Sequence, residues 1–426
     1  MSNDRSLAKR IAAAGGILFF FIMAFEVMIM ISPFAFFFYS VFSPVFNFLG
    51  QHTATRWATL FFLPHMILPP TLFLKSVRVA GSILFLLGLG TFTVCALQLY
   101  LGKIFKWGIA HRGLYSYIRH PQYLALGLWG MGMAILWPRF IVLATLSVMF
   151  VLYYFLAKDE ERRMLSLYCE SYQDYMARTG MFLPKALEAP FVALGSRVFP
   201  SLAVKYLAVP ALIVTFVMGS GFLLRQITLT SLPLATLGNL TLVSILPEDS
   251  GLEPRVLSDI SAAVTAGEVP FLKADKAYLG YVMPADYIMQ GMIADTGDQS
   301  HLFKHHHTVA LITDWVLHPF AHLRRPPSVH MAAMHGVDPA VARRHHCPAE
   351  VNQAAMECDT CSVRRVILVE VTPAPGQSVS GKTLLAGGLT RTPVGFLDLD
   401  AKDGRIIHVR PVAKNHAWKD VPTPEI

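Results

Sequence analysis

Long uncharged apolar stretches in the first 225 residues most strongly restrict how this 426-residue chain can fold. Residues 15–49 carry a single charge, that of Glu26. Further apolar stretches follow at about 57–74, 79–101, 122–137, 139–157 and 203–224. Because an apolar helix of roughly 17–25 residues spans a bilayer core, these stretches predict an α-helical integral membrane protein with about 5–7 transmembrane helices. A small soluble α+β domain is expected after them.

The overall composition agrees with this class. Hydrophobic residues make up 54% of the chain and charged residues 15%, which excludes a disordered, coiled-coil or fibrous protein. The formal net charge is +8, but the basic residues flank apolar stretches instead of forming a stripe. A bilayer with anionic lipid is therefore the expected partner, and nucleic acid is not.

The apolar stretches divide the chain into four expected parts. These are N-terminal transmembrane helices (1–78), a core with a helical hairpin and a cytoplasmic helix (79–190), a final transmembrane helix (191–226) and a soluble domain (227–426). The first stretch, 15–49, is interrupted by prolines and is interpreted as two crossings or as one crossing and an interfacial helix. It is too long for a cleaved signal peptide and lacks a small-residue cleavage site.

Basic loops predict the orientation of these helices. Loops 103–119 and 158–185 are rich in Lys and Arg and should face the cytoplasm, on the same side of a hairpin that turns at Trp137-Pro138-Arg139. The final crossing would then place residues 227–426 in the periplasm, if the membrane is a bacterial inner membrane.

The first of these loops contains a basic and aromatic motif where the chain re-enters the membrane. Pro121 suits the first turn of a helix, whose positive end would lie beside Arg119 and His120 and favour an anion. The alternative is that Arg119 is an interfacial anchor and that the neighbouring tyrosines form an aromatic belt.

The second loop begins with Glu160 and Glu161 and continues with helical spacing. This spacing places one acid and three tyrosines on one helix face, namely Glu161, Leu165, Tyr168, Tyr172 and Tyr175. Such a face could bind an ammonium group or a purine. The alternative is a solvated helix whose acids pair with Arg162 and Arg163.

Together, the two loops resemble the isoprenylcysteine carboxyl methyltransferase and phospholipid methyltransferase superfamily, over roughly residues 80–185. The shared pattern is Gly113-x-Tyr115-x-x-x-Arg119-His120-Pro121-x-Tyr123, a helical hairpin, Glu160-Glu161, Tyr172-x-x-Tyr175 and Pro184. The resemblance implies a membrane helical fold that encloses S-adenosylmethionine between the hairpin and the C-terminal catalytic helix. It also implies a lipid, isoprenoid or lipidated acceptor that arrives from the bilayer.

The resemblance assigns roles to individual residues. His120, Arg119 and Glu161 would be catalytic, and Glu160 or Glu161 would bind the ammonium group of the cofactor. The cofactor-binding set would be Tyr117, Arg119, His120, Pro121, Tyr123, Glu160, Glu161, Tyr172 and Tyr175. The chain departs from the family at Ala125, where members commonly have glycine, and in its additional C-terminal half.

The C-terminal half changes to a soluble pattern. A Ser/Thr/Leu/Pro linker is expected from residue 226, with helices near 255–265 and 308–323. Residues 365–371 form a buried type of strand, and 395–400 and 406–409 form a hairpin around Lys402-Asp403-Gly404.

Ten of the sixteen histidines lie between His301 and His346, and a Cys-x-x-Cys pair follows them. The candidate ligands of a transition metal are Asp314, His318, His322, His345, His346, Cys347, Cys358 and Cys361. A redox disulfide or reduced core thiols at Cys358 and Cys361 is the alternative. This domain could also bind a protein partner.

Three functions remain open at this point. The first is the methyltransferase implied by the resemblance. The second is an accessory subunit of a membrane complex, in which the C-terminal domain binds a metal or a redox partner. The third is a membrane oxidoreductase similar to steroid reductases, although no dinucleotide-binding glycine pattern follows a predicted strand.

Overall fold

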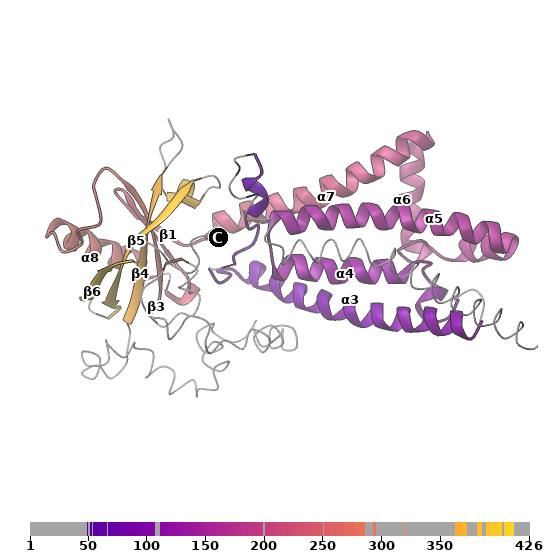
Figure 1. Cartoon of the computed structure of the whole chain (residues 1–426), viewed down its shortest axis with the longest axis horizontal. Coiled ribbons are helices and arrows are strands. Elements are labelled where there is room, and N and C mark those ends of the chain that lie inside the picture. Colours follow the sequence, from indigo (N-terminus) through magenta and orange to yellow (C-terminus); the bar gives the residue numbers. More distant parts are fainter. Residues whose placement is uncertain are drawn as a thin grey trace, which may run out of the picture. The chain divides into compact units, whose positions relative to one another are not determined.

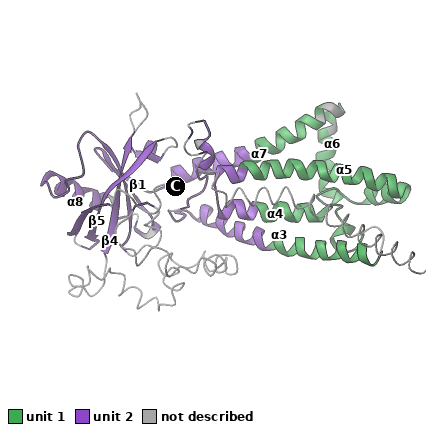
Figure 2. Ribbon diagram, viewed as in Figure 1, with its two compact units in different colours: residues 1–43, 87–130, 144–217 green, residues 44–86, 131–143, 218–426 purple. Residues whose placement is uncertain are grey.

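The fold is described from a computed structural model of the chain. The described residues are 49, 52, 54–65, 67–106, 111–198, 201–249, 251–285, 293–294, 320, 363–372, 381–385, 389–402 and 404–412. The chain divides into two compact units, coloured separately in Figure 2. Unit 1 contains residues 1–43, 87–130 and 144–217, and unit 2 contains residues 44–86, 131–143 and 218–426.

Long helices dominate the first half of the described chain (Figure 1). They are α3 (Leu72–Ile104), α4 (Pro121–Leu136), α5 (Phe140–Arg178), α6 (Lys185–Val198) and α7 (Leu202–Ser231). Three helical segments in the described part are long and apolar enough to cross a membrane: Leu72–Ile104, Phe140–Arg178 and Tyr206–Ser231. The predicted class, apolar helices followed by an α+β region, is confirmed. The crossings expected within residues 15–49 fall almost entirely outside the described residues.

The hairpin that supports the candidate site forms as predicted. Helix α4 begins at Pro121, and only three residues separate its end at Leu136 from the start of α5 at Phe140. Helix α4 packs closely against its neighbours. At Gly88 of α3 there is no room for a side chain, since an added Cβ atom would overlap the Trp129 backbone. A Cβ atom on Gly127 would likewise meet the Phe150 ring of α5 at 2.8 Å. Small residues of this kind allow apolar helices to approach closely in a bilayer.

The predicted crossing at residues 57–74 is wrong. Arg56–Thr59 form a short 3-10 helix, the described residues from 60 to 71 contain no helix, and α3 begins only at Leu72. Prolines at 64, 69 and 70 remove the backbone donors that a continuous helix needs. The irregular backbone is hydrogen-bonded in other ways, since Phe62 N donates to Pro138 O at 2.8 Å and Arg139 Nη1 to Thr59 O at 2.8 Å.

A mixed sheet forms the C-terminal part of unit 2. Its described strands are β1 (Leu234–Leu237), β2 (Leu240–Ser244), β3 (Ala277–Pro284), β4 (Val363–Thr372), β5 (Thr390–Asp400) and β6 (Ile406–Pro411). They lie side by side in sequence order. Only β2 and β3 pair in parallel, because helix α8 (Glu253–Thr265) connects them, and the other neighbours are antiparallel.

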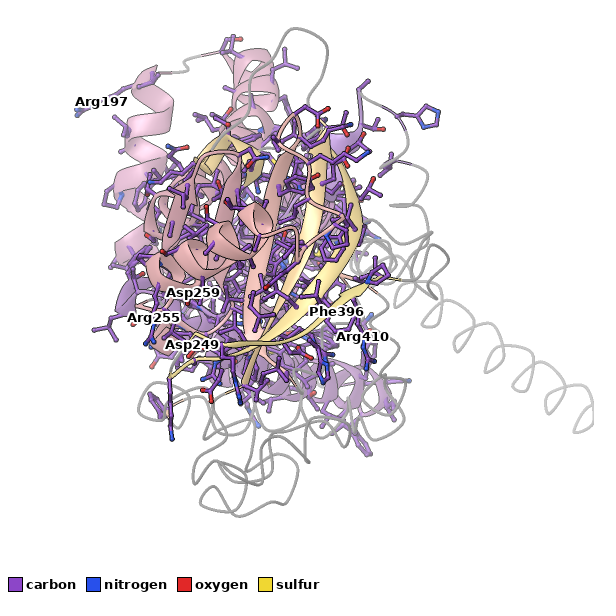
Figure 3. The ribbon with its side chains drawn as sticks, turned by 90° about the vertical axis from the view of Figure 1, so that its left-hand side faces the viewer. Arg197, Asp249, Arg255, Asp259, Phe396 and Arg410 are labelled. Atoms are coloured by element: carbon purple, nitrogen blue, oxygen red, sulfur yellow. The ribbon has the colours of Figure 1, made fainter. Side chains whose placement is uncertain are left out.

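Both faces of this sheet are apolar and buried. Helix α8 covers one face with Val256, Leu257 and Ile260, which pack on strand residues such as Val282 and Val366. Figure 3 looks at this part of the chain and labels Asp259 of α8 and Phe396 of β5. The opposite face carries a second core that includes Val243, Ile367 and Leu385.

The strand predictions are confirmed by β4 and by the β5–β6 hairpin, and the helix near 255–265 is α8. The predicted linker is wrong, because residues 226–231 continue α7 and β1 begins three residues later at Leu234. An uncharged, β-branched end to an apolar helix gives no stop signal of the kind that a Gly or Pro would give. The helix expected at 308–323 lies outside the described residues, apart from Phe320.

Candidate functional site

In unit 1, two segments that are distant in the sequence lie against each other beside the hairpin, one before α4 and the other after α5. Ile118 and Gly180 form a parallel β-bridge. Arg119 N donates to Gly180 O at 2.9 Å, and His120 N donates to Met181 O at 3.1 Å. Tyr175 adds a link from α5, since its hydroxyl donates to Tyr115 O at 2.6 Å. The basic motif is therefore fixed against the C-terminal end of α5.

The Arg119 guanidinium lies between a carboxylate and the end of a helix. Its Nε donates to Glu161 Oε1 at 2.7 Å. Its Nη1 donates to the carbonyls of Thr179 and of Met176, the latter at 3.4 Å and within the last turn of α5. A cation at this position satisfies carbonyls that have no helical partner and interacts favourably with the helix dipole. Arg119 therefore fixes the geometry of Glu161.

His120 is almost completely enclosed, with an exposed fraction of 2%. Its Nδ1 lies 3.5 Å from Glu160 Oε2, and its Nε2 lies 3.7 Å from Glu161 Oε1. Both separations are too long for good hydrogen bonds, and neither ring nitrogen has another hydrogen-bond partner. A buried imidazole with two such nitrogens has unused donor or acceptor capacity.

Aromatic rings continue from His120 towards the hairpin. His120 stacks on Tyr123 with ring centroids 5.6 Å apart, and Tyr123 stacks on Tyr153 of α5 at 5.0 Å. Phe182 approaches His120 at 6.1 Å. This row of rings presents π faces of the kind that attract cations.

The charged end of α5 extends beyond its apolar part. The helix has 39 residues, and its first 18, residues 140–157, carry no charge. At about 1.5 Å per residue it is nearly twice as long as a hydrocarbon core of about 30 Å. We therefore place Lys158 and the two glutamates outside the membrane-spanning segment.

The carboxylates change the proton affinity of His120. Burial alone would lower the pKa of His120, but the adjacent Glu160 and Glu161 raise it above its usual value. Burial would raise the pKa of Glu161, but His120 and the charges of Arg119 and Lys158 lower it to about 2. The site therefore favours an imidazolium beside two carboxylates.

The structure brings most of the sequence-predicted site residues together. Glu160, Glu161, Arg119, His120 and Tyr123 form the cluster, with Pro121 at the start of α4. Tyr172 is buried and its ring lies 5.7 Å from that of Tyr175. Tyr117 is 63% exposed and lies outside the cluster.

The predicted continuous tyrosine face of α5 is wrong in one respect. Cys169 has non-helical backbone angles, with φ 41° and ψ −119°, and kinks the helix. Tyr168, before the kink, is 41% exposed, whereas Tyr172, after it, is buried. The spacing rule assumed an unbroken helix, and nothing in the local sequence marks the kink.

Several residues of the site were missed by the sequence analysis. Tyr153 lies seven residues before Glu160 on α5, a helical spacing that could have indicated the same face. Lys158 Nζ lies 3.3 Å from Glu161 Oε2. Gly180 and Glu188 gave no signal, because their role depends on a bridge between distant segments.

The candidate metal ligands from Asp314 to Cys361 all lie outside the described residues. Among the residues that the structure describes, no group of three or more His, Cys, Asp or Glu side chains could hold a metal ion. The metal site therefore stays a prediction.

The comparisons agree with the site. The Isoprenylcysteine carboxyl methyltransferase (ICMT) family model matches residues 98–166, a range that contains Arg119, His120, Tyr123, Glu160 and Glu161. No curated protein and no solved structure matches the chain. The resemblance inferred from the motif is confirmed, and no finding supports the accessory-subunit or oxidoreductase alternatives. With the apolar helices, the match indicates an integral membrane methyltransferase.

Proposed function

We propose that this membrane methyltransferase transfers the methyl group of S-adenosylmethionine to a lipid, an isoprenoid or a lipidated acceptor at the cytoplasmic face of the membrane. The proposal rests chiefly on one observation. A buried His120 lies between Glu160 and Glu161, and both of its ring nitrogens lack hydrogen-bond partners. Buried polar atoms without a hydrogen-bond partner are uncommon, and at His120 two of them lie beside two carboxylates.

The residues present fit the chemical groups of this cofactor. Its ammonium group requires a carboxylate, and the Glu160 side chain is 33% exposed whereas that of Glu161 is 4% exposed. Glu161 is already held by Arg119 and Lys158, so Glu160 is the better partner for the ammonium group. The stacked rings of Tyr153, Tyr123 and His120 suit the sulfonium cation.

When bound, the cofactor supplies an activated methyl group. The chain then has to align the acceptor with that group and exclude water from it. Arg119 and Lys158 hold Glu161 in place, and Tyr175 fixes the Tyr115 backbone across the site. These contacts give the cluster a fixed geometry before any ligand binds.

A protonated His120, which the adjacent carboxylates favour by raising its pKa, would select one class of acceptor. An imidazolium has no lone pair with which to accept a proton, so it is a poor general base. A carboxylate or thiolate acceptor needs no base, and an imidazolium would attract it electrostatically. An anionic group on a lipid or lipidated molecule is therefore the preferred nucleophile.

The expected sides of the membrane follow from the lengths of single helices. The basic residues in segments 103–119 and 158–185 support a cytoplasmic site. Helix α7 has 30 residues and is long enough to cross once. A single crossing by α7 would place β1 and the following sheet on the periplasmic side if the membrane is a bacterial inner membrane.

Calorimetric titration with S-adenosylhomocysteine tests the proposal. The purified full-length protein in detergent should bind it, and Glu160→Gln should weaken binding by roughly 10- to 100-fold, the equivalent of about 1.5–3 kcal/mol for a charged hydrogen bond. Glu170→Gln is the matched control, because Glu170 lies on the same helix and is exposed. A folded wild type that binds neither S-adenosylhomocysteine nor S-adenosylmethionine would contradict the proposal.

A further inference from the structure

Helix α6 follows the site directly and leaves a continuous apolar face uncovered. Leu187, Phe191, Leu194 and Val198 recur at intervals of four, three and four residues, which places them on one side of the helix. They are between 55% and 69% exposed. Helix α6 is only 14 residues long, too short to cross a bilayer. Its apolar face therefore differs from the lipid-facing sides of the long helices.

Four of the large apolar residues of α6 lie on this face, and a fifth, Val192, is 62% exposed on another side of the helix. Lys185 and Arg197 lie near the two ends of the helix and are both exposed. Ala189 lies about 160° around the helix from Phe191, and Lys185 lies about 120° from it, as expected from the rotation of about 100° per residue in an α-helix. Long basic side chains beside an apolar helix face are typical of helices that lie in the head-group region of anionic membranes.

The position of α6 in the chain identifies what covers this face. Helix α6 begins seven residues after the end of one candidate membrane span, α5, and ends eight residues before another, Tyr206–Ser231. Its C-terminal end is thus tied to a segment that enters a bilayer, and its N-terminal end follows the charged part of α5, which we place outside the membrane. A membrane surface is then within reach of the apolar face.

We propose that α6 is an interfacial helix that inserts Leu187, Phe191, Leu194 and Val198 into the acyl boundary of an anionic membrane beside the candidate site. The bilayer surface is the partner of this face. Lys185 and Arg197 contact anionic head groups. This inference does not depend on the proposed methyl transfer.

The same helix is connected to the site. Glu188, in the first turn of α6, accepts a hydrogen bond from Met181 N at 2.5 Å, and Met181 O accepts one from His120 N at 3.1 Å. Two hydrogen bonds therefore link the interfacial helix to His120. Contact of α6 with lipid would set the depth of His120 relative to the membrane surface.

Tryptophan fluorescence in lipid vesicles tests the inference on the full chain. Phe191→Trp adds a fluorophore to the apolar face, and Ala189→Trp adds one to the opposite side. The fluorescence of the six native tryptophans is measured on wild type and subtracted. The vesicles contain equal amounts of phosphatidylcholine and phosphatidylglycerol, brominated either near the head-group end or near the terminus of the acyl chains. Both positions are exposed, so both variants should fold, which size-exclusion elution and the unfolding midpoint verify.

The expected result is that bromine near the head groups quenches the fluorescence added by Phe191→Trp at least about two-fold more than that added by Ala189→Trp. Bromine near the chain terminus should quench it less. Leu194→Trp, on the same face, should repeat this pattern. Equal quenching for the two sides, or none for Phe191→Trp and Leu194→Trp, would overturn the inference and show that protein covers this face. Neither readout involves S-adenosylmethionine, so the proposed function can fail independently.

Discussion

Each unit contains an arginine–carboxylate pair with little exposure to solvent, and the two pairs are built differently. In the sheet of unit 2, Arg365 and Asp398 face each other across β4 and β5 and join through two hydrogen bonds of 2.7 and 2.9 Å. The guanidinium also lies 4.5 Å from the Phe396 ring centroid. In unit 1, Arg119 and Glu161 share one hydrogen bond of 2.7 Å, next to His120 with its two unsatisfied nitrogens.

The difference distinguishes a closed structural pair from the candidate site. The pair in the sheet uses both oxygens of its carboxylate within the protein, which is the arrangement that offsets the cost of burying two charges. The cluster in unit 1 retains hydrogen-bonding capacity on His120 and a partly exposed Glu160. Burial of charge alone therefore does not identify a functional site, and the cluster in unit 1 is a candidate because unpaired nitrogens and carboxylates occur together in it.

The largest effect on stability should come from breaking the pair in the sheet. Asp398→Ala leaves the Arg365 guanidinium buried without its counter-charge, because Arg365 is only 3% exposed. Removing one partner of such a pair costs about 3–5 kcal/mol. Chemical unfolding of the full-length protein in detergent, followed by circular dichroism, should show this loss.

Lys276→Gln is the matched control in the same sheet. Lys276 pairs with Glu370 at 2.9 Å, but the lysine side chain is 42% exposed and the pair is screened by water. Its loss should leave the unfolding transition close to that of wild type. If Asp398→Ala were as stable as Lys276→Gln, the distinction between a closed structural pair and an ordinary surface pair would be lost.

A second prediction concerns the pH dependence of unit 1. The carboxylates raise the pKa of His120 on folding despite its burial, so His120 stabilises the folded state fully below about pH 6.5, the value of an unperturbed histidine. This contribution is lost as the pH rises through the raised native value. The contribution of Glu161 to stability changes with pH in the opposite direction. Because folding lowers its pKa, this contribution is present above about pH 4.5 and is lost as the pH falls towards 2.

Thermal unfolding between about pH 6 and pH 9 measures the His120 contribution. Wild type should lose stability with rising pH in this window, and His120→Gln should lose less. His111→Gln is the control, because His111 lies in the same segment and is exposed. An identical pH dependence for wild type and His120→Gln would show that the two carboxylates do not hold a proton on His120.

The two units also differ in how far their sequences predicted their structures. In the sheet, β4 and the β5–β6 hairpin were recognised because strand spacing and a Lys-Asp-Gly turn are local signals. In unit 1, Arg119, His120, Tyr123, Glu160 and Glu161 were recognised because they form a motif on two loops. Both successes rest on patterns within short segments.

The features that sequence reasoning missed depend on contacts between distant segments or on a local break in a helix. Residues 57–74 are apolar enough to cross a membrane, but their prolines and the hydrogen bonds to Pro138 and Arg139 produce an irregular segment. The kink at Cys169 lies between Tyr168, which is exposed, and Tyr172, which is buried. The bridge between Ile118 and Gly180, which fixes His120, has no counterpart in any periodic pattern.

The smallest predicted effect comes from Glu188, which touches neither reacting group and is a positioning residue. Its carboxylate accepts a hydrogen bond from Met181 N, and Met181 O in turn holds His120 N. Glu188→Ala removes the acceptor and should weaken S-adenosylhomocysteine binding by roughly five-fold, the equivalent of about 1 kcal/mol for one hydrogen bond. Glu188→Gln keeps an oxygen acceptor at the same place and should restore most of the affinity.

The two substitutions together separate positioning from charge. If the negative charge of Glu188 acted on the site directly, Gln would be as damaging as Ala, because both remove it. If the hydrogen bond to Met181 matters, only Ala should weaken binding, and the pH dependence assigned to His120 should be unchanged in Glu188→Gln. Equal affinities for wild type and Glu188→Ala would show that the bridge from Ile118 to Gly180 holds His120 without help from α6. The elements that position the cluster around His120 would then be only the hairpin and α5.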